Sequence, residues 1–265
     1  MNILFVGDIF GSAGRRIVHE HIGYLRQEHH VELLVINAEN AAGGFGLTPQ
    51  LAEEFFDLGA DVLTTGNHVW DKRELAEYMN SVPADSQDRP RRVLRPANLQ
   101  PNLPGYGVFE GVTANGVPFA VVDLMGRVFM NASNDPFHCA TALVAGIKAK
   151  VIVVDMHAEA TSEKVAMGWH LDGKVTAVLG THTHIPTADQ RVLPGGTAYQ
   201  TDVGMSGPYD SVIGVEKELV LHRFLTGMPG KFEAAKGNPK MCATLVSCDS
   251  DTGRATAIQR FMLGE

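Results

Sequence analysis

The feature that most constrains this chain is a series of short apolar runs that lack polar alternation. They are rich in Val, Ile and Leu, and longer stretches with helical character separate them. Runs of this kind are typical of parallel strands covered on both faces, so they predict an α/β fold with flanking helices. The runs cover residues 3–6, 33–36, 62–65, 151–154 and 175–179.

Start signals for helices lie between these runs. Thr48 and Pro49 precede residues 51–58, as an N-cap precedes a proline at the first helical position. Asp71 and Glu74 have capping-box spacing before a further helix, and we predict that Asp71 caps it. Both helices fit the crossovers that parallel strands require.

Residues 106–124 depart from this pattern. Asn115-Gly116 stands between strand-like runs at 107–113 and 118–123, which predicts an antiparallel hairpin with a type I′ turn. The sheets are therefore expected to be mixed but mostly parallel. The Pro- and Arg-rich stretch 81–104 is predicted to be a long surface loop, and a solvated connector is favoured there over a substrate-binding role.

Composition excludes several classes of protein. Of the 265 residues, 45% are hydrophobic and 20% are charged, which is ordinary for a globular chain that buries a core. We predict one domain spanning residues 1–265, because α/β folds of this length form a single core and no internal repeat or linker is evident. The net charge of -8 argues against a protein that holds long nucleic acids by neutralising their phosphates.

The sequence also predicts a cytoplasmic location. No basic leader precedes the first apolar run, and no run approaches the roughly 20 apolar residues of a membrane span. Cys139, Cys242 and Cys248 lack the spacing of a zinc or redox motif and are expected to be reduced thiols. Neither a signal peptide nor a membrane is therefore expected.

Side chains that can bind metals follow all five apolar runs. The segments are Gly7-Asp8, Asn37-Ala38-Glu39-Asn40, Gly66-Asn67-His68, Asp155-Met156-His157 and Gly180-Thr181-His182-Thr183-His184. In open α/β sheets, ligands bind outside the carboxyl ends of the strands. The five segments, distant in sequence, are therefore expected to meet at one rim and form a metal site.

Each segment alone has an ordinary structural explanation. With 11 His in 265 residues, chance places a His-x-His pair in roughly every second or third such chain. Asp8 could cap a helix, Asn40 and Asn67 could be turn residues, and His157 could be a hydrogen-bonded core histidine. Their joint occurrence favours the metal site, because all these explanations would have to apply at one edge of the sheet.

The candidate ligands are two carboxylates, two amides and three imidazoles, with no thiolate. They are Asp8, Glu39, Asn40, Asn67, His157, His182 and His184. This set suits a transition metal such as Fe or Mn, with Zn or Co as alternatives, better than Ca or Mg. Seven ligands are too many for one tetrahedral ion, so we predict two ions with Glu39 as the candidate bridge.

In their order and spacing these residues resemble the calcineurin-like metallophosphoesterase superfamily, and within it the bacterial YmdB-like subfamily. The resemblance extends to residues 201–205 and covers most of the chain. It implies a layered metallophosphoesterase fold and gives each ligand a role. Asp8, Asn40 and His184 would hold the first metal, Asn67, His157 and His182 the second, and Glu39 would bridge both.

The sequence departs from the broad superfamily pattern at two positions. Phe10 stands where the superfamily has the histidine of Asp-x-His, and Glu39 stands where a bridging aspartate is usual. Both departures resemble the YmdB-like subfamily, in which the asparagine equivalent to Asn40 replaces the missing histidine.

The resemblance implies a phosphodiesterase for 2′,3′- and/or 3′,5′-cyclic nucleotides, with a metal-bridging hydroxide as nucleophile. His68 is the candidate general acid for the leaving alkoxide, and the alternative is that it only orients Asn67. Phe10, Arg127 and Asp202 lie near expected strand ends and are weaker candidates for lining a pocket.

Other functions use the same ligands. A broad phosphomonoesterase needs an identical site, and a metal-stabilised regulatory module that binds a nucleotide or protein with little turnover needs no general acid. The expected partner is a small phosphorylated substrate, and a homo-oligomer is compatible with the sequence although no residue indicates one.

Overall fold

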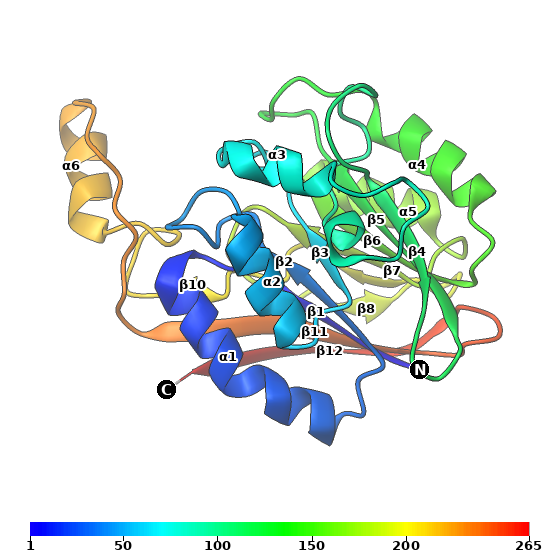
Figure 1. Ribbon diagram of the computed structural model, residues 1–265. Coiled ribbons are helices and arrows are strands. Elements are labelled where there is room, and N and C mark those ends of the chain that lie inside the picture. Colours follow the sequence, from blue (N-terminus) through cyan, green and yellow to red (C-terminus); the bar gives the residue numbers. More distant parts are fainter. Residues whose placement is uncertain (265) are drawn as a thin grey trace.

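Two six-stranded sheets, each covered by helices on its outer face, form the computed structural model, which describes residues 1–264 (Figure 1). The first sheet contains β1 (Asn2–Val6), β2 (Leu33–Asn37), β3 (Val62–Thr64), β10 (Gly207–Pro208), β11 (Pro239–Cys248) and β12 (Ala255–Gly264). The second contains β4 (Val108–Val112), β5 (Pro118–Met125), β6 (Val151–His157), β7 (Ala177–Thr181), β8 (Arg191–Val192) and β9 (Ala198–Gln200).

The helices pack in two groups. Residues of α1 (Gly11–Glu28), α2 (Pro49–Asp57) and α3 (Arg73–Met79) join a core with the outward side chains of β1 and β2. Those of α4 (Pro136–Gly146) and α5 (Thr161–Leu171) join a core with β5 and β6. A short 3₁₀ helix, η1 (Arg89–Arg92), and α6 (Lys217–Thr226) complete the described helices, and α6 stands away from the main body (Figure 1).

Side-chain alternation along β1 explains why the strand has no polar face. Ile3 and Phe5 enter the core between the two sheets, whereas Leu4 and Val6 enter the core beneath α1 and α2. Successive side chains of a strand point to opposite faces, so a strand with a core on each side must be apolar throughout. The apolar runs read from the sequence are the consequence of this layering.

The predicted α/β class with mixed sheets and flanking helices is confirmed. β1, β2 and β3 are parallel, as are β5, β6, β7 and β9. β4 and β8 add antiparallel edges to the second sheet, and β11 pairs antiparallel with β1 and β12. Antiparallel pairing is more extensive than expected, because β11 and β12 were not predicted.

The hairpin turn differs from the prediction. β4 and β5 pair antiparallel, but Thr113 accepts from the N–H of Gly116 and donates its own N–H to Val117, which leaves a three-residue loop. Gly116 has φ +83°, whereas Asn115 does not adopt a positive φ. The connection is a type I turn followed by a left-handed glycine, not a type I′ turn.

The stretch 81–104 is not a surface loop throughout. Val93 and Leu94 are buried, and isolated bridges join them to Leu63 and Tyr106. Arg95 is also buried, with its guanidinium bonded to backbone carbonyls. The abundance of Pro and Arg concealed a short extended segment that extends the edge of the first sheet.

Among residues 1–264, no helix combines the length and apolar character that crossing a bilayer requires.

Candidate metal centre

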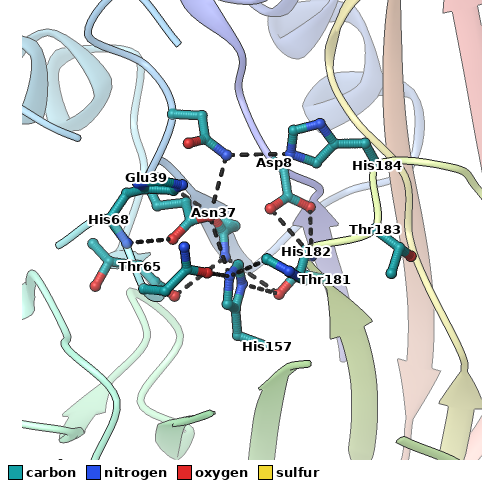
Figure 2. A network of polar contacts seen from close by, with 12 residues as sticks. Asp8, Asn37, Glu39, Thr65, His68, His157, Thr181, His182, Thr183 and His184 are labelled. Atoms are coloured by element: carbon teal, nitrogen blue, oxygen red, sulfur yellow. Dashed lines mark hydrogen bonds and ion pairs between the residues drawn. The ribbon is translucent and has the colours of Figure 1, made fainter. Parts of the chain in front are cut away.

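Five strands from both sheets deliver polar side chains to one site (Figure 2). β1, β2 and β3 belong to the first sheet, and β6 and β7 to the second. The predicted ligands lie at or just after the carboxyl ends of these strands: Asp8, Glu39, Asn40, Asn67, His157, His182 and His184. The structure brings all seven together through direct polar contacts.

Glu39 and His157 form the centre of the cluster. Glu39 Oε1 lies 3.1 Å from His157 Nε2, and the same nitrogen lies 3.0 Å from Asn67 Oδ1 and 3.1 Å from His182 Nδ1. Ligand atoms of Glu39, His157 and His182 all lie within 4.8 Å of one another. His182 Nε2 contacts Glu159 at 3.2 Å, so its Nδ1 is the nitrogen that faces the cluster.

Asn40 and His184 form the second part of the cluster. The Nδ2 of Asn40 lies 3.1 Å from Glu39 Oε1 and 3.2 Å from His184 Nε2. The Nδ1–H of His184 donates to the carbonyl of Ile213 at 2.8 Å. This bond fixes the tautomer that leaves Nε2 with a lone pair facing the site.

The loop that carries the last two histidines is held in an unusual backbone conformation. His182 has φ +93° and His184 φ +67°, values that residues other than glycine rarely adopt. Asp202 fixes Thr183 between them, accepting from its N–H at 3.1 Å and its hydroxyl at 2.6 Å. The N–H of His182 donates to both carboxylate oxygens of Asp8, at 3.3 and 3.2 Å.

The donor atoms fit metal ions. Asn40 Oδ1 is buried yet has no hydrogen-bond partner within residues 1–264, and a metal ion would satisfy it. Gly66 keeps the backbone close to the cluster, because a Cβ there would lie 2.3 Å from His157 Nε2 and 2.4 Å from Glu39 Oε2. Carboxylate, amide and imidazole donors are groups that bind divalent metal ions.

Burial and mutual contact shift the pKa values of the cluster. Burial opposes ionisation of Glu39, but the charge and hydrogen bond of His157 outweigh it and lower the pKa of Glu39 to about 2. Burial also opposes protonation of His157, and Glu39 overcomes it and raises that pKa to about 9. Burial raises the pKa of Asp8 to about 6. For Asp8, burial therefore outweighs the positive charge already present in the site, and a metal ion would supply more.

A chain of buried groups beneath the cluster orients His157. Its Nδ1 lies 2.9 Å from the Thr181 hydroxyl, which donates to Asp155 at 2.6 Å. Asp155 also accepts from Thr64 at 2.6 Å and from Asn37 at 2.9 Å. Asp155 is not among the seven candidate ligands, and its carboxylate is occupied by this network, which orients His157 through Thr181.

His68 lies at the rim of the cluster. Its N–H donates to Glu39 Oε2 at 3.3 Å, and its Nδ1 lies 2.9 Å from Asp71 Oδ2. The prediction that Asp71 caps a helix is wrong, because α3 begins at Arg73 with Lys72 as its N-cap and has no side-chain cap. The carboxylate instead contacts the imidazole of His68 and orients it.

Comparison with known proteins identifies the family. The model of a family described as YmdB-like protein matches residues 4–261. The chain belongs to the YmdB-like family. It is 43% identical to the 2′,3′-cyclic-nucleotide 2′-phosphodiesterase of Bacillus subtilis (strain 168), with 100% of this chain and 98% of that protein covered.

Solved structures agree with this membership. A hypothetical protein from Thermus thermophilus has a TM-score of 0.91 and 41% identity, with both chains fully covered at 100%. A phosphatase from Mycoplasma pneumoniae also has a TM-score of 0.91, with 32% identity, covering 100% of this chain and 93% of that one. These comparisons confirm the predicted metallophosphoesterase fold of this YmdB-like chain. They also confirm the prediction that it is an enzyme that hydrolyses phosphoester bonds.

The three weaker candidates from the sequence have different surroundings. Phe10 is buried, lines the cavity above the cluster and meets the ring of His184 edge-on, with centroids 5.6 Å apart. Asp202 is buried outside the cavity and forms an ion pair with Lys164 Nζ at 2.6 Å. Arg127 is exposed and lies 3.9 Å from Asp135 at the surface. Of these three residues, Phe10 alone lines the cavity at the cluster.

Proposed function

We propose that this chain is a dinuclear metal-dependent phosphodiesterase that hydrolyses 2′,3′-cyclic nucleotides. The observation that carries the proposal is the buried cluster around Glu39, whose atoms include an unpartnered amide oxygen on Asn40. The substrate class comes from the Bacillus subtilis relative, which is 43% identical over the whole chain. 3′,5′-Cyclic nucleotides are the second substrate class to be tested at the same site.

The ligands divide into two sets around Glu39. In this proposal Asp8, Asn40 and His184 hold one ion, Asn67, His157 and His182 hold the other, and Glu39 bridges them. Asn40 is adjacent to His184, and Asn67 to His157, which supports this division. Fe and Mn are the favoured ions. Two such ions would lower the pKa of a bound water to near neutrality and would neutralise charge on the phosphoryl oxygens.

His68 is the proposed proton donor to the leaving alkoxide. It lines the cavity, and its bond to Asp71 holds the ring in the tautomer that carries a proton on Nδ1. When the imidazole is protonated, Nε2 is then the nitrogen that delivers the proton.

The net charge of -8 gives the protein little general attraction for an anionic substrate. Positive charge confined to the metal site would therefore select small phosphate esters over long nucleic acids. A phosphomonoesterase and a regulatory module with little turnover remain the alternatives to be separated by assay.

The test combines metal analysis with hydrolysis. Purified protein is assayed for metal content, then for turnover of 2′,3′- and 3′,5′-cyclic nucleotides and of nucleoside monophosphates, before and after chelation and addition of Mn²⁺. We expect about two ions per chain and chelator-sensitive hydrolysis of the 2′,3′-cyclic substrates. Faster turnover of monophosphates would favour a phosphomonoesterase, and metal binding without turnover of any ester would favour the regulatory module.

A further inference from the structure

The metal cluster opens into a cavity that is far larger than a phosphate group needs. The cavity has a volume of about 610 Å³, within the roughly 300–1,000 Å³ of sites that enclose small organic ligands. Glu39, Asn40, His68, His182 and His184 line one end. The remaining wall is mainly apolar and includes Phe45, Val212, Val220, Phe224 and Phe232.

Helix α6 builds the outer part of this wall. Val220 is its one buried residue among those described, and it packs with Phe10 and Val215 in a small separate core. Phe224 lines the cavity although its side chain is 81% exposed. Leu221 and Leu225 of the same helix are also exposed but do not line the cavity. The position of Phe224 in the cavity wall, and not its exposure alone, therefore points to a ligand with an apolar or aromatic face.

Arg223 gives the same wall a polar group. Its guanidinium lies 5.2 Å from the centre of the Phe232 ring, and it also lines the cavity. The two carboxylates that line the cavity, Glu39 and Glu159, are engaged with His157 and His182. The α6 end therefore combines aromatic surface with cationic hydrogen-bond donors, whereas the metal end receives the phosphate.

We propose that Phe224 and Arg223 of α6 form a subsite for the base of a nucleotide whose phosphate lies at the metal cluster. This inference rests on the proposed function and adds the residues that distinguish a nucleotide from a simpler phosphodiester. The ring of Phe224 stacks on the base, and Arg223 donates to carbonyl or ring-nitrogen acceptors on the base edge. A base offers both an aromatic face for Phe224 and hydrogen-bond acceptors for Arg223. The alkyl group of a simple phosphodiester offers neither.

Phe45 is a second aromatic ring in the cavity, but it is a poor target for a test. It contacts His68 edge-on, with ring centroids 5.1 Å apart, so its replacement would also disturb the proposed proton donor. Phe224 has no such contact with the metal ligands. Leu225 provides a matched control, because it is 84% exposed on the same helix but does not line the cavity.

The experiment compares the wild type, Phe224→Ala, Phe224→Trp and Leu225→Ala, each loaded with Mn²⁺. The substrates are adenosine 2′,3′-cyclic phosphate and methyl riboside 2′,3′-cyclic phosphate, which lacks the base. For Phe224→Ala we expect KM for the nucleotide to rise about tenfold with kcat nearly unchanged, because stacking on an aromatic side chain contributes on that scale. Phe224→Trp and Leu225→Ala should keep KM near the wild-type value, and no variant should alter KM for the base-free ester.

Several results would overturn the subsite. One is an equal change in KM for both substrates, and another is no change for either. A lower assembly mass of Phe224→Ala in size-exclusion chromatography, with KM for the nucleotide unaltered, would instead make α6 a contact between copies of the chain.

A binding measurement keeps the subsite testable if cyclic nucleotides are not hydrolysed. Calorimetry with adenosine 3′-monophosphate and with ribose phosphate, on the same variants, then reports affinity alone. Weaker binding of the adenosine ligand to Phe224→Ala, with ribose phosphate unaffected, would support the subsite even though the proposed reaction had failed. Equal affinities of Phe224→Ala and wild type would reject the subsite as well.

Discussion

His68 and Asp71 form the residue pair on which proton transfer is expected to depend. Replacing His68 with Ala should lower kcat for a cyclic nucleotide about 10²- to 10⁴-fold, the range that a positioned general acid contributes. Metal content should not change, because only the backbone N–H of residue 68 contacts Glu39 and alanine keeps it. Steady-state kinetics and metal analysis of the same samples check both expectations.

His19 serves as the control for this substitution, because it is exposed on α1 and does not line the cavity at the metal cluster. His19→Ala should retain the wild-type kcat. Loss of metal from His68→Ala would instead assign His68 the alternative role of orienting Asn67.

Thr181 links a buried carboxylate to His157, and the link should be measurable as metal affinity. Thr181→Val keeps the side-chain volume but removes the hydroxyl that contacts both His157 and Asp155. We expect about 10- to 100-fold weaker Mn²⁺ binding by titration of the metal-free protein, as for other groups that orient a histidine ligand.

Thr64→Val is the matched control for this second prediction, since Thr64 donates to the same Asp155 but contacts no ligand. It should weaken Mn²⁺ binding much less. Equal losses in the two variants would mean that the Asp155 network, and not the link through Thr181, sets the affinity.

Single residues also mark the limits of reading the site from sequence. The convergence of seven side chains was predictable, because strand ends share one rim whatever the exact strand bounds. The role of Asp71 was not, since capping and contact with His68 require the same spacing and differ only in where α3 begins. The role of Thr181 could not be predicted, because the function of a hydroxyl inside an apolar strand depends on the side chains that contact it in the fold.

At the scale of elements, the register of β5 and β6 places two buried carboxylates side by side. Asp123 is paired with Asp155, and burial followed by the charge of Asp155 raises the pKa of Asp123 well above its ordinary value. Asp123 Oδ1 also lacks a hydrogen-bond partner among the described residues, while Oδ2 accepts from the N–H of Thr65. The folded protein therefore binds the proton of this side chain more tightly than the unfolded chain does.

A pH dependence of stability follows from that shift. Because the folded-state pKa exceeds the unfolded value of about 3.9, the folded state binds more protons, and the free energy of unfolding falls as pH rises between the two values. Asp123→Asn imitates the neutral acid and removes this loss. Denaturant unfolding of metal-free protein should show the variant gaining on the wild type from pH 4.5 to pH 8, and a constant difference would contradict the assignment.

The two C-terminal strands, β11 and β12, were not predicted from the sequence. The parallel strands were recognisable because each is apolar throughout, whereas β12 is exposed at many positions and gives no such run. β11 is mostly buried, but its sequence does not show that it pairs with β1. That pairing joins residues more than 230 positions apart and depends on the assembly of the whole sheet. Propensity along the chain does not specify which strand will insert next to another.

At the scale of the whole molecule, the metal cluster joins the two sheets. Glu39 follows β2 of the first sheet, and His157 ends β6 of the second, yet their side chains lie 3.1 Å apart. Ions bound between them would cross-link the layers in the folded state only. Metal binding should therefore contribute to the free energy of unfolding of the entire fold.

Removing metal should accordingly lower the melting temperature. At a free Mn²⁺ concentration about 100 times the Kd, one site stabilises the fold by about 2.7 kcal/mol, and each kcal/mol shifts Tm by about 2–4 °C for a chain of this size. Chelation should thus lower Tm by about 5–10 °C in a thermal melt, and added Mn²⁺ should restore it. His182→Ala with His184→Ala, which removes a ligand from each set, should abolish the restored increment. An unchanged Tm on chelation of protein shown to contain metal would mean that the unfolded chain binds the ions as tightly as the folded one, which would contradict a site that only the fold assembles.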